Sequence, residues 1–377
     1  MSNRIDFFQP VENTLALPAA TVSVLLEGSP CPYLEPIEIV YSEYPEFGWA
    51  RLAYNPAAYA GDSLTSIEDI EAELAIGKSI CIRQVYNNSA PDVSICSVPI
   101  FTGKIESVET SIGADGEKVE VTAMDFSTSL KRITVCGRRV RDEDGSSVFV
   151  ENLDTIFNED GEGNAAVESA ENQGNSYTVF AEESSARKLW SYAEATEYLL
   201  CEYLTAGDLQ RPAIEQLQPL TENRIVSNLD VTEMSLLEAL HRCCEEAGIK
   251  FRFAARFMQG AAGEAIVFYK GGAGRIVELN CQRAGQRFSI SRTNVSKLSV
   301  RKSFNEASEV TATVDLETPY LFFDYRVGDR VKSGIDGKDL LGTRRDNKGI
   351  CRIERVRLDF KNQCTNLRIV RQRNVGL

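Results

Sequence analysis

The chain has 377 residues, of which 43% are hydrophobic and 25% charged, and this length predicts two to four subdomains. No apolar run approaches the about 18 residues that a helical membrane span needs, which excludes that class of protein. The first twenty residues lack the basic-then-apolar layout of a secretory signal, so we expect a protein made in the cytosol or assembled there into something larger.

The formal net charge of −14 is unevenly distributed along the chain. Residues 251–377 hold 24 Lys and Arg against 13 Asp and Glu, a net of +11, which leaves 17 basic and 42 acidic residues before them, a net of −25. The asymmetry indicates that the two halves meet each other or face different partners, although acidic loops alone could produce it. No basic block is interleaved with aromatic residues, so a specific nucleic-acid site is not expected.

The first sixty residues contain seven of the twelve prolines, and short strands are predicted between them at residues 22–26, 37–40 and 49–55. Apolar residues at three- and four-residue spacing predict a short helix over Ser63–Leu74. A strand is expected from Ile76 to Tyr86.

The most regular pattern lies in residues 98–133 and predicts a β-hairpin followed by one short helical turn. Val119, Val121 and Ala123 alternate with polar residues, as in a half-buried strand. The partner strand, Pro99–Glu109, changes its apolar parity near Gly103, which predicts a bulge or bend there. Asp125 or Ser127 is the expected N-cap of the helical turn.

Residues 138–183 are polar, acidic and rich in glycine, and predict a solvated loop. Within them, Asn158-x-Asp160-x-Glu162-Gly163 resembles the start of a calcium-binding loop, with oxygen ligands at alternate positions and glycine at the sixth. The twelfth position is Ser169 instead of a bidentate glutamate, so the calcium hypothesis is the weaker one.

Two helices are predicted after this loop, over Ser185–Leu204 and Ser235–Ala247. Ser235 and Glu238 form a capping box and Gly248 ends the second helix. Alternating residues from Ile249 to Phe253 and a partner at Ala265–Tyr269 then predict strands. The glycine-rich segment 271–274 is expected to be a hairpin turn leading into the strand 276–281, because no helix follows it to bind phosphate.

No residue is expected to be catalytic, to bind a cofactor or to bind a metal. The ten cysteines contain no CxxC pair and are expected to be buried free thiols. His241 is the only histidine and has Cys244 three residues on, but a nucleophile and base would still need an orienting acid and an oxyanion site. The expected role of His241 is that of a half-buried helix residue.

The last quarter is predicted to be β-structure. Val310–Leu316 alternates, Tyr325–Val331 contains a tight turn at Gly-Asp, and Ile350–Phe360 and Thr365–Arg371 predict a second hairpin.

Three stretches of the chain resemble the phage tail and baseplate central hub proteins of the late control protein D type. A W-x-x-L strand at Trp49 precedes the first hairpin, and the unit at Leu237-x-x-Leu240 and Gly248-x-x-Phe251 lies in the middle. The matching residues of the two hairpin regions are Phe101, Gly103, Ile105, Val108, Val121, Ala123, Asp125 and Leu130, then Tyr325, Gly328, Asp329, Val331, Ile353, Val356, Asp359, Phe360, Thr365, Leu367 and Ile369.

The resemblance implies an α+β, mostly β, fold with two small β-barrel (tube-like) domains separated by α+β insert domains. The expected domains are a first barrel with a short helix at residues 1–137, an acidic loop and helical insert at 138–230, an α+β domain with a helix and then a hairpin at 231–285, and a second barrel at 286–377.

The same resemblance implies a structural virion protein and not an enzyme, located in the virion tail and assembled in the host bacterial cytoplasm. Three copies would form a pseudo-hexameric ring that joins the hexameric tail tube to the tip or spike and surrounds the DNA channel. Expected partners are two further copies in a homotrimer, the tail tube or distal tail protein, the tip or spike protein and the tape measure protein. DNA only passes through the lumen, and no cofactor is expected.

Two other functions are compatible with the sequence. One is a cell-wall glycan hydrolase built of β-domains around a carboxylate pair, although none of the 55 acidic residues is marked out as such a pair. The other is a cytosolic carbohydrate- or protein-binding β-module.

Overall fold

The computed structural model describes residues 21–46, 48–54, 71–86, 96–113, 116–141, 147–161, 163, 165–168, 178–181, 189–205, 207, 209–258, 261–270, 274–279, 295–304, 310–332 and 349–373. By its internal contacts the chain divides into two units. Unit 1 is Met1–Met124 with Gly272–Leu377, and unit 2 is Asp125–Gly271. The fold is α+β and mostly β, as the sequence predicted.

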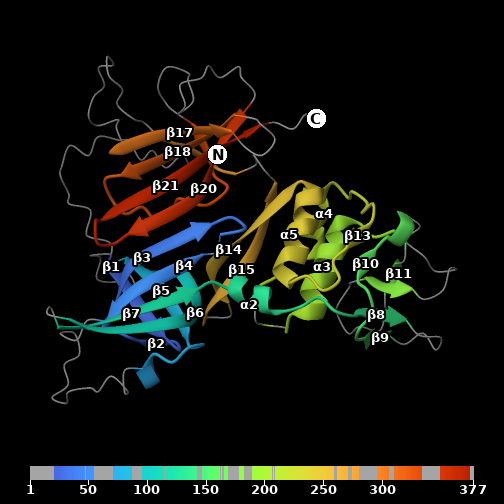
Figure 1. Ribbon diagram of the computed structural model, residues 1–377, viewed down its shortest axis with the longest axis horizontal. Coiled ribbons are helices and arrows are strands. Elements are labelled where there is room, and N and C mark those ends of the chain that lie inside the picture. Colours follow the sequence, from blue (N-terminus) through green and yellow to red (C-terminus); the bar gives the residue numbers. More distant parts are fainter. Residues whose placement is uncertain are drawn as a thin grey trace. The chain divides into compact units, whose positions relative to one another are not determined.

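Unit 1 contains one thirteen-stranded sheet whose strands come from both ends of the chain (Figure 1). The order along the sheet is β17-β18-β21-β20-β3-β4-β7-β6-β5-β1-β2, and β19 joins β16 to β20. The bounds are β1 Thr21–Leu26, β2 Ser29–Pro30, β3 Leu34–Ser42, β4 Trp49–Tyr54, β5 Ser79–Tyr86, β6 Cys96–Gly113, β7 Gly116–Met124, β16 Ile276–Glu278, β17 Lys297–Phe304, β18 Val310–Thr318, β19 Arg330–Lys332, β20 Gly349–Asp359 and β21 Cys364–Arg373.

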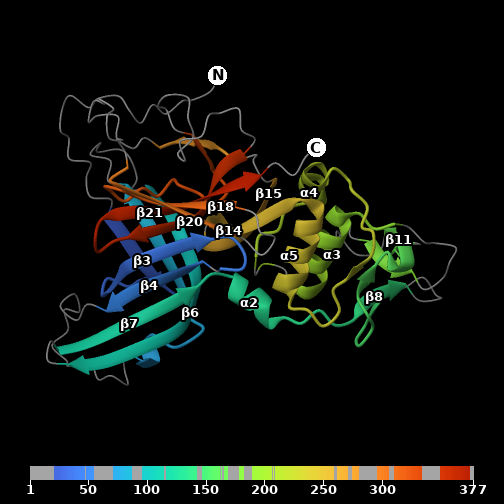
Figure 2. The ribbon, with the colours of Figure 1, turned by 45° about the horizontal axis from the view of Figure 1, so that its top comes forward.

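The N-terminal and C-terminal strands meet where β3 pairs with β20, and Figure 2 shows these two strands side by side. Hydrogen bonds among the described strands therefore form one continuous sheet and close no barrel. The two barrels and the four domain boundaries of the sequence analysis stay predictions.

The predicted hairpin is confirmed, and Gly103 lies at its bend. The strand β6 has an extra residue on each side of this glycine, where its register shifts against β5 and against β7. A Cβ at Gly103 would lie 2.8 Å from the carbonyl carbon of Met124 and closer still to its oxygen, so only glycine fits here.

One hydrophobic core holds unit 1 together, with side chains from both sets of strands. Ile39 and Leu52 from the N-terminal strands lie in the same fully buried cluster as Ile353 and Val356 from β20. Burying each such side chain contributes about 1.5–3 kcal/mol, so the N-terminal and C-terminal strands stabilise each other.

Unit 2 combines helices with short strands. Its elements are α2 Ser127–Arg132, β8 Arg138–Arg141, β9 Ser147–Val150, β10 Ile156–Phe157, the 3₁₀ turn η2 Glu159–Gly161, β11 Ala165–Glu168, β12 Thr178–Ala181, α3 Tyr192–Tyr203, α4 Ile214–Thr221, β13 Leu229–Asp230, α5 Leu236–Ala247, β14 Ile249–Met258 and β15 Ala261–Lys270. None of the helices in the described residues has the length and apolar composition that a membrane span requires.

The helix α5 confirms its prediction from end to end. Ser235 is the N-cap, its hydroxyl accepts the N–H of Glu238 at 3.2 Å, and the Glu238 carboxylate accepts the N–H of Ser235 at 3.1 Å. Gly248 closes the helix in the left-handed conformation.

Two other boundaries in unit 2 differ from the sequence analysis, and one predicted helix of unit 1 is described only in part. The helix α3 begins at Tyr192, because Ser191 and Glu194 form a capping box there; residues 182–188 lie outside the described part. The N-cap of α2 is Phe126, while the Asp125 carboxylate accepts the N–H of Ser127 at 3.1 Å. Of the predicted helix at Ser63–Leu74, only residues 71–74 are described.

Strands also replace much of the loop predicted for residues 138–183. β8, β9, β11 and β12 form a four-stranded sheet in the order β11-β12-β8-β9. The reason is an aromatic cluster in which Phe157, Phe180, Trp190 and Tyr198 are completely or almost completely buried, with ring centroids 5.0–5.9 Å apart. Isolated apolar residues within the acidic sequence supply two of these rings.

Candidate interaction surface

The histidine and cysteine that the sequence analysis considered lie together on α5 but do not form a nucleophilic pair. Cys244 is 1% exposed, and burial raises the pKa of its thiol well above the usual value. His241 Nε2 lies 3.8 Å from the Glu245 carboxylate, and burial lowers the pKa of the imidazole. A nucleophilic cysteine must reach the thiolate form, so Cys244 acts as a core residue of the helix.

Asn158, the first residue of the calcium-like motif, uses its side chain to join three backbone segments. Its Nδ2 donates to the carbonyl oxygens of Trp190 at 2.9 Å and Val226 at 2.7 Å, and its Oδ1 accepts the N–H of Trp190 at 2.7 Å. The side chain is completely buried. No group of three or more possible metal ligands occurs in the described residues, and Glu162 and Ser169 lie outside them.

The prediction that the glycine-rich segment 271–274 is a hairpin turn is wrong, because the strand after it does not pair with the strand before it. Residues 271–273 lie outside the described part, and β16 pairs in parallel with β19 and not with the preceding strand. The backbone carbonyl of Arg275 accepts the N–H of Arg330 at 2.7 Å. The guanidinium of Arg275 donates to the Asp329 carboxylate at 2.9 Å. This ion pair attaches the segment to the C-terminal turn.

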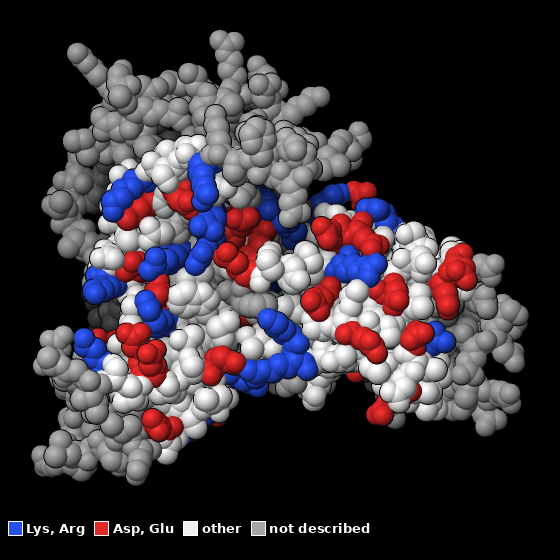
Figure 3. All heavy atoms as spheres, viewed as in Figure 1, with Lys and Arg blue, Asp and Glu red and all other residues white. Residues whose placement is uncertain are grey.

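The outer face of the C-terminal strands carries ordered rows of charge. Cross-strand pairs place six residues in two rows over β18, β21 and β20: Asp315, Arg368 and Arg355, then Glu317, Asn366 and Arg357. These side chains line a groove of about 540 Å³. On the visible face of unit 1, Figure 3 shows cations and anions interspersed, without a large patch of one sign.

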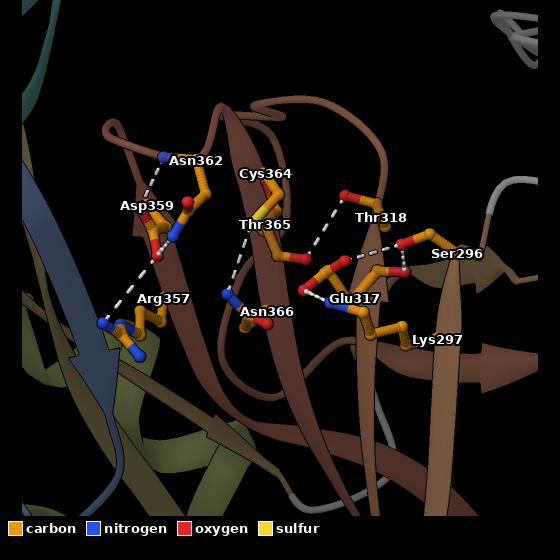
Figure 4. Close-up of polar contacts among 10 residues, drawn as sticks. All are labelled: Ser296, Lys297, Glu317, Thr318, Arg357, Asp359, Asn362, Cys364, Thr365 and Asn366. Atoms are coloured by element: carbon orange, nitrogen blue, oxygen red, sulfur yellow. Dashed lines mark hydrogen bonds and ion pairs between the residues drawn. The ribbon is translucent and has the colours of Figure 1, made fainter.

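Polar groups that line this groove or lie next to it in the sequence pair with one another (Figure 4). Glu317 accepts from Lys297 at 3.1 Å and from the Ser296 hydroxyl at 3.0 Å. Asp359 accepts two hydrogen bonds from Asn362, both at 2.9 Å. The lining has four basic and two acidic residues, and Glu46 and Glu38, outside the lining, pair with Arg355 and Arg357. Because each cation therefore has an anionic partner, this extended surface of paired charges suits contact with protein.

Ion pairs continue across the joint between β20 and β3. The Glu38 carboxylate, with 5% of its side chain exposed, lies 2.5 Å from Arg357 and 2.6 Å from Arg51. Arg355 and Arg368 approach Glu46 at 3.4 and 4.0 Å. Because the carboxylate is buried, removal of either cation would leave its charge less well compensated, so the joint depends on both ion pairs.

The two sets of strands repeat the same local structure. Gly77 and Gly328 both have φ of +91°, a value that favours glycine. The N–H of Gly77 donates to Ile105 O at 2.8 Å, and the N–H of Gly328 donates to Ile353 O at 2.8 Å. The return bonds also correspond, from Ile105 to Lys78 at 2.9 Å and from Ile353 to Asp329 at 2.8 Å.

The register of the strands repeats as well. In the β6–β7 pair one extra residue follows Ile105, and in the β20–β21 pair one extra residue follows Ile353. Ala123 pairs with Ala50 of β4 as Ile369 pairs with Val314 of β18. The first repeat (β3 to β7) and the second repeat (β17 to β21) are thus equivalent strand by strand, with β3 corresponding to β17 and β6 to β20.

Comparison with known proteins identifies the fold. No protein-family model matches the chain, and no curated protein matches its sequence. A tail protein from Neisseria meningitidis MC58 is similar in structure, with a TM-score of 0.50 and 11% identity over 94% of this chain and 97% of that chain. The 43 kDa tail protein of prophage MuSo2 from Shewanella oneidensis has a TM-score of 0.50 and 10% identity over the same shares. The chain therefore has the fold of phage tail proteins, as the resemblance of its sequence implied.

Proposed function

We propose that the chain is a structural protein of a phage-like tail and forms the central hub at the tail tip. The observation that supports this most is the internal repeat. Two equivalent five-stranded repeats are joined through β3 and β20 in a chain whose fold is that of tail proteins.

Two repeats in each chain explain how the hub could adapt one symmetry to another. Three copies contain six repeats, so a closed trimer presents near-sixfold symmetry wherever the repeats are equivalent and threefold symmetry wherever they differ. Such a ring would bind the hexameric tail tube or distal tail protein on one side and the tip or spike protein on the other. The tape measure protein and the DNA would occupy or pass through its lumen.

The charge of the chain fits this passage. Residues before 251 carry a net of −25, and we infer that they contribute to the lumen wall. Like charge keeps DNA from adhering during passage. Mapping the charge of an assembled ring tests this inference, and a basic wall would refute it.

The hub role is tested by locating the chain in purified tail particles. A tagged chain, imaged by electron microscopy, is expected at the tail tip as a ring of three copies. A tail without the chain, or a single copy in each particle, would overturn the proposal. A monomer in dilute solution would not, because assembly depends on concentration and on neighbouring subunits.

A peptidoglycan zymogram separates this proposal from the glycan hydrolase. The hub is expected to give no cleared band, since its role requires no catalysis. A cleared band that a carboxylate substitution removes would establish an enzyme instead.

A further inference from the structure

We propose that neighbouring copies join by antiparallel pairing of β17 of one chain with residues 107–111 of β6 of the next. This inference rests on the proposed ring and names the two edges that close it. The pairing would repeat, between chains, the joint that β3 and β20 form within each chain.

The internal repeat supplies the register of this contact. Within the chain, Arg355, Arg357 and Asp359 of β20 lie opposite residues 42, 40 and 38 of β3. Counting from the matched positions Ile105 and Ile353, their counterparts in β6 are residues 107, 109 and 111. The counterparts of the β3 residues in β17 follow in two steps. Ala50 of β4 and Val314 of β18 correspond, because they pair with the matched residues Ala123 and Ile369. Ile39 pairs with Ala50 and Val300 pairs with Val314, so Ile39 of β3 corresponds to Val300 of β17. The proposed opposite pairs are Ser107 with Ser303, Glu109 with Arg301, and Ser111 with Ser299.

Both edges are open in the described part of the chain. β17 pairs there with β18 alone and ends the sheet. β6 pairs with β5 only as far as Lys104, so residues 107–113 have β7 on one side and no described strand on the other. An open edge presents unpaired backbone groups, which makes it a template for a strand of another chain.

Burial shows what the contact would cover. Ile39 of β3 is completely buried, whereas its counterpart Val300 of β17 is 43% exposed. On the other side, Val356 of β20 is completely buried, while its counterpart Val108 is only partly buried. The in-chain joint buries both apolar positions, so the same pairing between chains would bury Val300 and Val108.

The charges of the two edges are complementary. β17 contains three basic residues and no acidic one, whereas residues 107–113 of β6 contain Glu109 and no basic residue. Arg301 would lie directly opposite Glu109, where a cross-strand ion pair is favourable. In the in-chain joint the signs are exchanged, because β20 supplies the cation Arg357 and β3 the anion Glu38. The basic second half of one chain thus meets the acidic first half of the next.

Disulfide trapping tests the register. In the in-chain joint, Glu43 N–H donates to Glu354 O at 3.3 Å and Phe360 N–H to Ile37 O at 2.9 Å, which makes Asp359 and Glu38 a non-hydrogen-bonded pair. Such pairs have Cα atoms about 4.5 Å apart, within disulfide range. The double variant S111C/S299C transfers this geometry to the proposed contact. Oxidised tail particles that carry it are expected to give covalent dimers and trimers on a non-reducing gel.

Matched variants define the possible outcomes. R355C/S42C should cross-link within one chain, and S107C/S299C, which is out of register, should cross-link weakly; the unmodified chain measures the background from the ten native cysteines. If R355C/S42C closes and three copies are present but S111C/S299C forms no bond between chains, the edge assignment is wrong and the ring stands. A single copy in each particle would overturn the ring itself.

A surface substitution provides a second readout. Val300→Asp places a charge where the contact would bury a methyl group. It should reduce the association constant between copies of the chain by at least about tenfold, without changing the melting temperature of the single chain. Val148→Asp is the control, because Val148 is 45% exposed and lies in unit 2. Equal assembly of the two variants would contradict the proposal.

Discussion

Asn158→Asp is a sharp test of whether the acidic segment is a structural joint or a metal-binding loop. The substitution keeps the shape of the side chain but removes both donors, which bond to Trp190 O at 2.9 Å and Val226 O at 2.7 Å. It also brings a carboxylate against these carbonyl oxygens. A calcium site would gain a better ligand from the same change, so the two interpretations predict opposite effects.

The expected loss follows from the contacts. Two buried hydrogen bonds contribute roughly 0.5–1.5 kcal/mol each, and an uncompensated buried charge adds a similar or larger penalty, for a total of about 3–5 kcal/mol. One kcal/mol shifts the melting temperature of a domain of this size by about 2–4 °C, so the unit 2 transition should fall by roughly 6–20 °C. Burial would raise the pKa of the new carboxyl above its unfolded value, so the deficit should shrink as the pH falls through that range.

Calorimetry with calcium and with a chelator measures both effects. Asn152→Asp is the control, because Asn152 also has a positive φ, of 64°, but is exposed. It should change stability by less than about 0.5 kcal/mol. An Asn158→Asp variant as stable as the parent, or one that calcium restores, would refute the structural role.

Three further substitutions test the joints of the fold. Gly103→Ala should cost unit 1 at least about 3 kcal/mol in denaturant unfolding, because the added Cβ meets the backbone of Met124; a loss below about 1 kcal/mol would contradict the close approach. Burial, with a contribution from Glu215, raises the pKa of the Glu197 carboxyl from 4.5 to about 7. The folded state therefore holds this proton more tightly than the unfolded state, and the protein loses stability as the pH rises from 4.5 to about 7. Glu197→Gln should remove that slope and be more stable than the parent by about 1–2 kcal/mol at alkaline pH, and equal slopes would count against it. Glu38→Gln should lower the stability of unit 1 by about 1–2 kcal/mol, and because the carboxylate is buried this loss should change little with salt; a variant as stable as the parent would contradict the ionic role.

Local rules gave correct predictions wherever neighbours in the sequence decide the structure. The capping box of α5 and its terminal Gly248 lie within fourteen residues, so the helix bounds could be predicted from them alone. The β6–β7 and β20–β21 hairpins also join adjacent segments, and their alternating apolar residues predicted them.

The sequence-based predictions were wrong where residues far apart in the sequence decide the secondary structure or the strand pairing. The acidic segment forms strands because Phe157 and Phe180 pack against Trp190, which precedes α3, and against Tyr198 on α3. The glycine-rich segment leads into a strand that pairs with β19, more than fifty residues away, and not with the strand just before it. The late start of α3 follows from Ser191, whose capping hydrogen bonds outweigh the helical spacing that continues before it.

The sequence by itself determined the mostly β class, the hairpins, the helix α5 and the separation of acidic from basic charge. Only the tertiary structure decided that β3 pairs with β20 and that two repeats share one sheet, with Glu38 bound to an arginine 319 residues away. Pairing between such distant strands depends on which faces can be buried together, and this is a property of the assembled core that no single segment encodes.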